Sequence, residues 1–155
     1  MFETIAWATD GSELADGALE HVRELARLHG SGIVAVHANE VLTGRFGGAP
    51  LLADEPEIRH KIEAQVAELR TAGFDAKLEV LSGGDDVATL IERAAAEAGA
   101  DLVVVGTHGR SGVTAALLGS VARALCHTSR RPVLVVPPAD RAERAADDAP
   151  QLTTA

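Results

Sequence analysis

Residues 102–112 read LVVVGTHGRSG, and this stretch indicates how the chain folds. The apolar run Leu102–Gly106 is typical of a strand that is buried on both faces, as strands are in parallel sheets covered by helices. Glycines follow the run closely, and helical spacing of apolar residues resumes from about Thr114 to His127. A strand, a glycine-rich loop and a helix in this order predict an α/β fold.

The same alternation extends over the rest of the chain. Three further segments place apolar residues three and four positions apart, which predicts one buried face of a helix. Because strands and helices alternate throughout, we expect a parallel sheet with helices on both faces. The remaining predicted strands are Thr4–Thr9, Gly32–Ala38, Ala76–Leu81 and Pro132–Val136, and the remaining helical segments run across Leu14–Ala26, Ile58–Leu69 and Val87–Ala98.

Residues that begin or end helices support this order. Gly30, Gly73 and Gly99 each close a helical pattern and precede a strand, where a left-handed C-cap is needed. Ser12 and Asp85 are suited to cap helix N-termini, because their side-chain oxygens accept hydrogen bonds from backbone N–H groups. These signals predict where the helices start and stop.

Two segments fall outside the alternation. Asn39–Pro56 contains glycines and prolines around Phe46 and predicts a long, mobile connection, since loops of this length are usually functional or disordered. Phe46 is suited either to cover a bound base or to pack on a helix. We expect residues 1–138 to form a single α/β domain and residues 139–155 to form a disordered C-terminal tail.

The composition narrows the class of protein. The chain has 155 residues and a net charge of −9 without a long basic run, so we expect no non-specific binding to nucleic acid or to an anionic membrane. Its single cysteine, Cys126, excludes an intramolecular disulfide and a thiolate zinc site, and its place in the last helix predicts a packed side chain. Neither a membrane-spanning apolar stretch nor a secretory signal is recognisable, which predicts a cytoplasmic protein.

The glycine-rich loop after Gly106 indicates phosphate binding. Glycines let backbone N–H groups face an anion, the start of the next helix adds donors and a positive dipole end, and Ser120 adds a hydroxyl. The loop is not a Walker P-loop, because both lysines, Lys61 and Lys77, lie outside the glycine loops. The sequence also argues against a Rossmann dinucleotide fold, because the first strand leads into Asp10–Ser12 rather than into Gly-x-Gly-x-x-Gly.

The glycine spacing Gly106-x2-Gly109-x9-Gly119-Ser120 is similar to the ATP-binding pattern G-2x-G-9x-G-[S/T] of the universal stress protein family. Other motifs resemble that family in the same order along the chain, and the likeness extends from Thr4 to Pro137. These motifs are Ala8–Ser12 after the first strand, Val36–Ala38 at the end of the second, Ala100–Gly109 around the fourth and Arg131–Pro137 at the last.

The resemblance implies an open five-stranded parallel sheet of order 3-2-1-4-5 with helices on both faces, similar to the adenine nucleotide alpha hydrolase-like fold. The first and fourth strands are then neighbours where the winding reverses, which is the usual ligand site of open α/β sheets. ATP is implied there, with Mg²⁺ accompanying the nucleotide, and the histidines show no spacing of a dedicated metal site. A homodimer through the last strand, Pro132–Val136, is also implied, because an open apolar edge invites pairing, together with an unidentified protein partner.

The resemblance also implies roles for single residues. Asp10 would bond the ribose hydroxyls, while the residues alone also allow an Asx turn or a helix cap. Ala38 would offer backbone groups to adenine, Gly106 would lie against the ribose and the α-phosphate, and Arg110 suits an outer phosphate or a solvated loop position. The full predicted nucleotide-binding set is Thr9, Asp10, Gly11, Ala38, Gly106, His108, Gly109, Arg110, Gly112, Gly119, Ser120 and Val121, of which Gly109, Gly119, Ser120 and Val121 would hold the β- and γ-phosphates.

No residue is assigned a catalytic role. A Ser-His-Asp set, paired loop carboxylates and a phosphate-gripping lysine are not recognisable, so any ATP hydrolysis is expected to be slow. The predicted function is that of an ATP-binding regulatory protein of the stress response. Two alternatives stay open: a nucleotide-free interaction module, or an ATPase or adenylyl-transferring enzyme that uses His108 or Asp10. His37 is expected to be a packed strand-end residue, and Ser82–Asp86 a turn followed by an N-cap.

Overall fold

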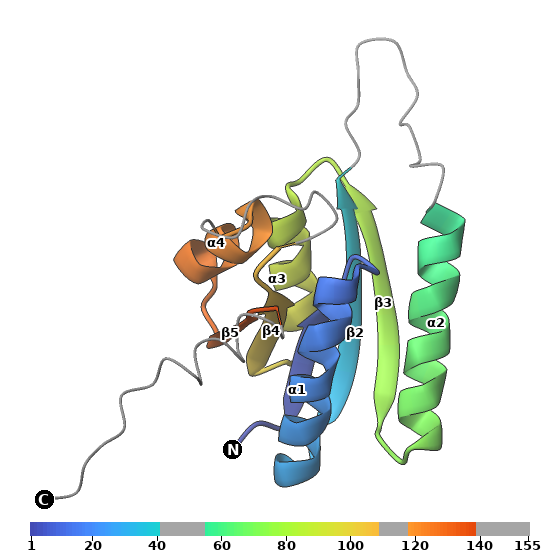
Figure 1. Ribbon diagram of the computed structural model, residues 1–155. Coiled ribbons are helices and arrows are strands. Elements are labelled where there is room, and N and C mark those ends of the chain that lie inside the picture. Colours follow the sequence, from blue (N-terminus) through green and yellow to red (C-terminus); the bar gives the residue numbers. More distant parts are fainter. Residues whose placement is uncertain (41–54, 109–117, 139–155) are drawn as a thin grey trace, which may run out of the picture.

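The computed structural model describes residues 1–40, 55–108 and 118–138 (Figure 1). Its strands form one parallel sheet in the order β3-β2-β1-β4-β5, which confirms the predicted fold class. The open sheet reverses its winding between β1 and β4, as expected. The strands are β1 (Thr4–Ala8), β2 (Gly32–Glu40), β3 (Ala76–Gly83), β4 (Leu102–Gly106) and β5 (Val133–Val136).

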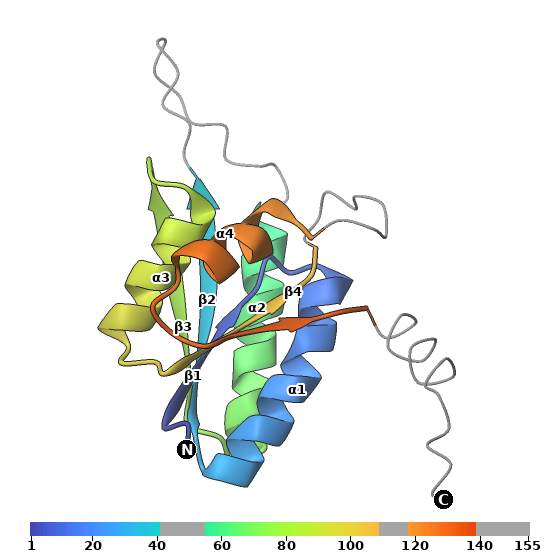
Figure 2. The same cartoon turned by 90° about the vertical axis from the view of Figure 1, so that its left-hand side faces the viewer.

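Helices cover both faces of the sheet, as the strand–helix alternation predicts. The helices α1 (Glu13–His29) and α2 (Glu55–Thr71) lie on one face, and α3 (Val87–Glu97) and α4 (Ser120–Thr128) lie on the other, as Figures 1 and 2 show together. Successive strand residues point to opposite faces, so each strand contributes to both layers of the core. No helix in the described part of the chain is both long and apolar enough to cross a membrane.

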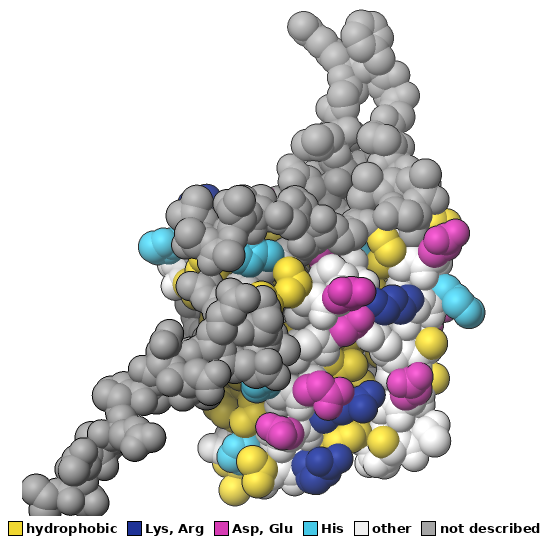
Figure 3. Space-filling view, viewed as in Figure 1, with side chains coloured by type: hydrophobic (Ala, Val, Ile, Leu, Met, Phe, Trp, Pro, Cys, Tyr) yellow, Lys and Arg dark blue, Asp and Glu magenta, His cyan; other side chains and the backbone are white. Residues whose placement is uncertain are grey.

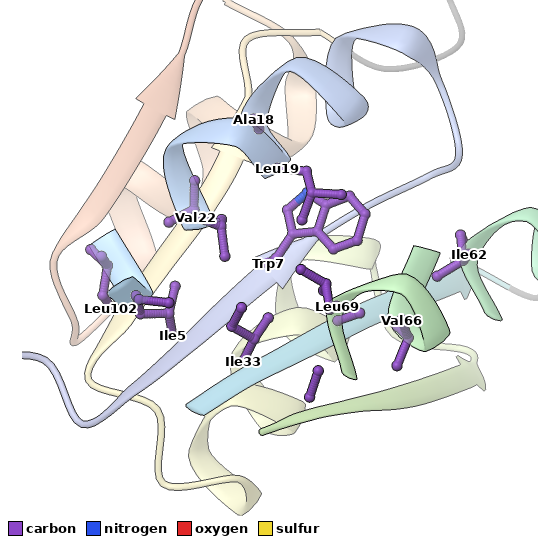
Figure 4. Close-up of a cluster of buried hydrophobic side chains, with 14 of the residues drawn as sticks. Ile5, Trp7, Ala18, Leu19, Val22, Ile33, Ile62, Val66, Leu69 and Leu102 are labelled. Atoms are coloured by element: carbon purple, nitrogen blue, oxygen red, sulfur yellow. The ribbon is translucent and has the colours of Figure 1, made fainter. Parts of the chain in front are cut away.

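The core beneath α1 and α2 is built around Trp7, which is fully buried (Figure 4). Ile5 and Trp7 of β1 pack there with Val22 of α1 and Leu69 of α2. The Trp7 indole Nε1 donates a hydrogen bond of 3.1 Å to the carbonyl oxygen of Ala15 in the first turn of α1. The largest side chain of the core therefore lies directly under the start of α1, with its only polar atom satisfied.

The helix caps lie at the residues that the sequence predicts, except that the N-cap of α3 is shifted by one residue. The φ angles of Gly30, Gly73 and Gly99 are +71°, +92° and +67°, which confirms the left-handed turns. Ser12 caps α1, because its side chain accepts a hydrogen bond from the Ala15 amide. The cap of α3 is Asp86.

The prediction that Asp85 caps this helix is wrong. The Asp86 Oδ1 accepts from the Thr89 amide at 3.1 Å, and its Oδ2 accepts from the Thr89 hydroxyl at 2.7 Å. Asp85 instead pairs with Arg93 at 3.1 Å. The two aspartates are adjacent and chemically identical, and only the residue with extended backbone directly before the helix has its carboxylate in reach of the third amide.

Two further expectations are corrected. The connection after the second strand is shorter than Asn39–Pro56, because β2 continues to Glu40 and α2 begins at Glu55. Strand pairing explains the extension, since Asn39 and Glu40 align with Ser82 and Gly83 of β3. Cys126 is exposed rather than packed, because α4 buries Ala122 and Leu125 and turns the next residue outward.

Several expectations fall outside the described residues. These are residues 114–117 of the predicted last helix, the tail 139–155, and Phe46 with the rest of residues 41–54. The predicted start of that helix near Thr114 is wrong, because Leu118 and Gly119 are not helical and α4 begins at Ser120. β5 forms one edge of the sheet, and its residues before Val136 are half-buried. The homodimer through this strand stays a prediction.

Candidate functional site

The loop between β1 and α1 is held in one shape by its own side chains. The Thr9 amide donates to the Val36 carbonyl at 3.0 Å, which extends the sheet pairing by one residue. The Asp10 Oδ1 then accepts from the Ser12 amide at 3.0 Å, and the Thr9 hydroxyl oxygen accepts from the Gly11 amide at 3.2 Å. Asp10 therefore forms the Asx turn that the sequence allows. This turn is compatible with a ribose contact, because a carboxylate has about four acceptor sites on its two oxygens.

The segment after β4 lies beside this loop. The Thr107 amide donates to the Val136 carbonyl at 3.0 Å, and the Gly119 amide donates to the Thr107 carbonyl at 2.8 Å. The His108 Nδ1 lies 3.2 Å from the Thr107 hydroxyl oxygen. The start of α4 is thus bonded directly to the carboxyl end of β4.

Gly106 and Gly119 leave room for the backbone of the protein itself. A Cβ at Gly119 would lie 2.9 Å from the Thr107 carbonyl oxygen, and a Cβ at Gly106 would lie 3.1 Å from the Leu14 carbonyl oxygen. In the sequence, these glycines are interpreted as positions where backbone N–H groups face a bound anion. The structure supplies a second reason, since a side chain at either position would push apart β4, α1 and the start of α4.

The N-terminus of α4 differs from those of α1 and α3. Its N-cap is Gly119, and no side chain caps it within the described part of the chain, whereas Ser12 and Asp86 cap the other two. Gly119 has φ −59° and ψ 157°, so its own backbone is extended and the helix begins at Ser120. The first-turn N–H groups of α4 are donors of the kind that bind phosphate at helix N-termini.

The described members of the predicted nucleotide-binding set gather at the carboxyl ends of the strands. In Figure 1 these ends of β2 and β3 point to the top of the view. Asp10 follows β1, Ala38 lies near the end of β2 and His108 follows β4. Neighbouring strands thus bring together Thr9, Asp10, Gly11, Ala38, Gly106, His108, Gly119, Ser120 and Val121, whereas Gly109, Arg110 and Gly112 lie outside the described residues.

His37 adds a partner that the sequence does not reveal. Its side chain is 1% exposed, which confirms the expected packed strand-end residue. Its Nδ1 lies 3.0 Å from the Thr9 carbonyl oxygen and its Nε2 lies 2.9 Å from the Glu55 Oε1. The Asn39 side-chain amide donates to the same Glu55 oxygen at 2.6 Å. Glu55 is far from His37 in sequence, and no local signal pairs them.

Lys61 is a second missed residue. In the sequence, Lys61 is distinguished only by lying outside the glycine loops. In the structure its Nζ donates to the Gly11 carbonyl at 2.7 Å and to the Asp16 Oδ2 at 2.6 Å. The Gln65 side-chain amide donates to the other oxygen of Asp16 at 2.7 Å. One helix, α2, thus reaches the loop that contains Asp10.

Charged side chains of both signs are interspersed over α1 and α2 on the face that Figure 3 shows. No large patch of one sign lies on those helices in this view, so their side-chain charge would not by itself concentrate a polyanion there. Within residues 1–40, 55–108 and 118–138, no group of three or more His, Cys, Asp or Glu residues could hold a metal ion. The donors at the candidate site are mainly backbone groups.

Residues 1–137 match the universal stress protein family. The chain belongs to the universal stress protein family. A family member from Burkholderia pseudomallei has a solved structure with a TM-score of 0.70 and 30% identity, covering 88% of this chain and 96% of that one. The solved structure of protein MJ0577 has a TM-score of 0.75 and 29% identity, covering 89% of this chain and 97% of that one.

Curated relatives agree with this assignment. Universal stress protein MJ0577 of Methanocaldococcus jannaschii is 28% identical over 88% of this chain and 95% of its own length. Universal stress protein Rv2005c of Mycobacterium tuberculosis is 33% identical over 81% of this chain. The chain spans only 42% of the length of that mycobacterial relative.

Two similar solved structures of the family carry adenine nucleotides. A universal stress protein from Archaeoglobus fulgidus in complex with dAMP has a TM-score of 0.65 and 26% identity over 87% of this chain and 97% of its own. A universal stress protein in complex with cAMP has a TM-score of 0.66 and 25% identity, with the same two coverages. Nucleotide binding is therefore found among universal stress proteins that share this fold.

Proposed function

We propose that this universal stress protein binds ATP at the carboxyl ends of β1 and β4 and acts as a nucleotide-dependent regulatory protein of the stress response. The observation that carries the proposal is the N-terminus of α4, where a glycine cap leaves the first-turn amides without a side-chain partner among the described residues. These amides belong to the Gly-x2-Gly-x9-Gly-Ser pattern and follow directly on β4. The dAMP and cAMP complexes of similar proteins support an adenine nucleotide.

The proposed binding residues divide by the part of the nucleotide they would hold. Asp10 would accept hydrogen bonds from the ribose hydroxyls, and the backbone of Ala38 would face the adenine. Ser120 and Val121 would donate to the β- and γ-phosphates, since the positive end of the α4 dipole favours negative charge. Gly119, whose amide donates to the Thr107 carbonyl, would lie against the same phosphates without donating to them. Thr9, Gly11, Gly106 and His108 complete the described part of the site, and Gly109, Arg110 and Gly112 complete the motif. Mg²⁺ would arrive with the phosphates, which supply most of its ligands.

Binding rather than turnover is the proposed activity. A Ser-His-Asp set, paired loop carboxylates and a phosphate-gripping lysine are not recognisable in the sequence, and the ring of His108 is next to the Thr107 hydroxyl. A bound nucleotide stabilises the folded protein by mass action, by about 2.7 kcal/mol at a hundredfold excess over Kd. That nucleotide-dependent state is what a partner protein would recognise. The cytoplasmic location stays a prediction.

The amide donors can be tested by one substitution that keeps the helix. Ser120→Pro removes the Ser120 N–H, yet proline is favoured at the first helical position, and the extended backbone of Gly119 is the conformation that precedes a proline. Ser120→Ala removes only the hydroxyl and serves as the matched control. We expect ATP affinity, measured by titration calorimetry, to fall about tenfold in Ser120→Pro and only about two- to threefold in Ser120→Ala.

Nucleotides of different phosphate length give the second control. AMP lacks the β- and γ-phosphates, so its affinity should change much less in Ser120→Pro than the affinity for ATP. The increase in melting temperature of the wild-type protein with ATP, ADP, AMP and GTP ranks these four nucleotides as candidates for the physiological ligand. A wild-type melting temperature that does not respond to any of these nucleotides at millimolar concentration would contradict the proposed function.

A further inference from the structure

The two backbone carbonyls that flank Asp10 are both hydrogen-bonded to side chains linked to α2. The Thr9 carbonyl oxygen lies 3.0 Å from the Nδ1 of His37, and the Gly11 carbonyl accepts from the Nζ of Lys61 at 2.7 Å. Asp10 is therefore held between two clamps, neither of which uses the Asp10 side chain. Because β1 ends at Ala8, these clamps act where the sheet no longer fixes the backbone.

The first clamp is buried. A carbonyl oxygen only accepts hydrogen bonds, so the Nδ1 of His37 donates to Thr9. The opposite ring nitrogen lies 2.9 Å from the Glu55 Oε1, at the first residue of α2, and Asn39 donates to that oxygen as well. The imidazole thus connects the end of β1 to the N-terminus of α2 with both of its nitrogens.

The second clamp consists of a single side chain, that of Lys61, which bonds the Gly11 carbonyl directly. Lys61 is oriented by Asp16, which accepts from its Nζ at 2.6 Å and is itself held by the amide of Gln65. Ile58 packs against the same loop, since a Cβ at Gly11 would lie 2.8 Å from its Cγ2. Glu55, Ile58 and Lys61 are spaced by three residues, so they form one stripe along α2.

We propose that Lys61 is a positioning residue for the nucleotide site: by holding the Gly11 carbonyl from α2, it fixes Asp10 in the orientation that meets the ribose. This inference rests on the proposed function. A loop held in its bound shape loses less conformational freedom when the ligand arrives, so the clamp raises affinity without touching the nucleotide. Its effect should therefore be specific to the ribose hydroxyls, which Asp10 would bind.

The test replaces Lys61 by methionine, which keeps most of the side-chain stem and removes the Nζ. The side chain of Lys61 is 41% exposed, so the substitution leaves no buried cavity. Arg59→Met is the matched control, because Arg59 lies on the same helix, carries the same charge and, within the described part of the chain, pairs with the exposed Glu63 at 3.1 Å. Lys61→Arg retains a positive donor group and serves as the conservative variant.

The first measurement needs no ligand. Hydrogen exchange of the Gly11 and Ser12 amides reports the loop directly, since both amides bond within it. We expect exchange at these two amides to become about fivefold faster or more in Lys61→Met, to stay at the wild-type rate in Arg59→Met, and to stay near it in Lys61→Arg. Equal rates in Lys61→Met and Arg59→Met would overturn the proposal, whether or not the protein binds nucleotide.

The second measurement compares ATP with 2′,3′-dideoxy-ATP, which lacks both ribose hydroxyls. We expect Lys61→Met to weaken ATP binding about three- to tenfold and to leave the affinity for the dideoxy analogue within about twofold of wild type. Equal weakening of both nucleotides would show a general structural effect and would reject the positioning role. If the wild-type protein binds neither nucleotide, the proposed function fails, and amide exchange alone decides whether Lys61 holds the loop.

Discussion

Gly11 combines two constraints at a single residue of the candidate site. Its φ is +75°, a region that side chains other than glycine rarely adopt, and Ile58 occupies the space where a Cβ would lie. The carbonyl of the same residue accepts from Lys61. Gly11 is therefore where the conformation of the β1–α1 loop and the packing of α2 meet.

Comparing Gly11→Ala with Gly30→Ala is expected to separate the effect of the left-handed backbone from that of the contact with Ile58. Gly11→Ala should lower the free energy of unfolding by about 2–3 kcal/mol, about 1 from the left-handed backbone and the rest from the contact with Ile58. Gly30→Ala should lose only about 1 kcal/mol, because its φ is +71° but nothing lies within 4 Å of a Cβ there. Chemical denaturation of both variants gives the difference.

A third glycine provides the opposite control. Gly17 is exposed in the middle of α1 and has open space around a Cβ, so Gly17→Ala should stabilise the protein by up to about 1 kcal/mol. If Gly11→Ala and Gly30→Ala prove equally destabilising, the packing of Ile58 on the loop is not significant.

At the scale of elements, the sequence predicts the order, the type and most ends of the helices and strands, because each is set by local chemistry. Buried β-branched runs, helical spacing and glycine C-caps all act within a few residues. Two features that the sequence does not reveal depend on contacts across the fold. Asn39 is polar and still belongs to β2, because β3 pairs with it, and Glu55 of α2 forms a buried pair with His37 of β2. The cap at Asp86 and the exposure of Cys126 depend instead on the local backbone and on the helix phase.

Local and long-range contacts also divide the residues of the candidate site. Asp10 and the spaced glycines can be recognised from the sequence because each belongs to a motif within one short segment of the chain. Lys61 and Asp16 come from two different helices, and the hydrogen bonds from the Lys61 Nζ to Asp16 and to the Gly11 carbonyl exist only once α2 is packed beside α1. Residues that position a binding loop from another element carry no spacing that a single sequence could reveal.

The N-cap of α3 makes a pH-dependent prediction. Hydrogen bonds from the Thr89 side chain and backbone lower the pKa of Asp86 below its ordinary value of 3.8. A carboxyl whose pKa is lowered by folding contributes stability that is present above its unfolded-state pKa and is lost as the pH falls through the folded-state value. The cap therefore weakens only in acid, below about pH 4.

Asp86→Asn retains a capping oxygen and cannot titrate in this range. We expect its melting temperature to stay near wild type at pH 7 and to decrease less than that of wild type between pH 5 and pH 3. Asp85→Asn is the neighbouring control, since Asp85 pairs with Arg93 and caps nothing. Parallel acid profiles for Asp86→Asn and wild type would be evidence against the capping role.

On the scale of the whole molecule, β5 is an edge strand among the residues that the structure describes. Within them it pairs only with β4, and the valines and leucine before Val136 are half-buried in the single chain. Open strand edges pair with other chains unless they are covered. Light scattering of the purified protein at micromolar concentration should give a mass near twice 16.0 kDa. A Leu134→Lys variant should shift the mass toward the monomer, and a wild-type mass of a single chain would refute the dimer.

The burial of Trp7 gives this fold an optical property. The chain has one tryptophan and no tyrosine, so a single indole dominates its ultraviolet emission. That indole is buried beneath α1 and donates a hydrogen bond to the Ala15 carbonyl. Ala15 lies in the first turn of α1, which Ser12 caps two residues after Asp10. Under the proposed function, a change of the β1–α1 loop around a nucleotide would reach the indole through one helical turn, so that tryptophan emission would report occupancy without an added label.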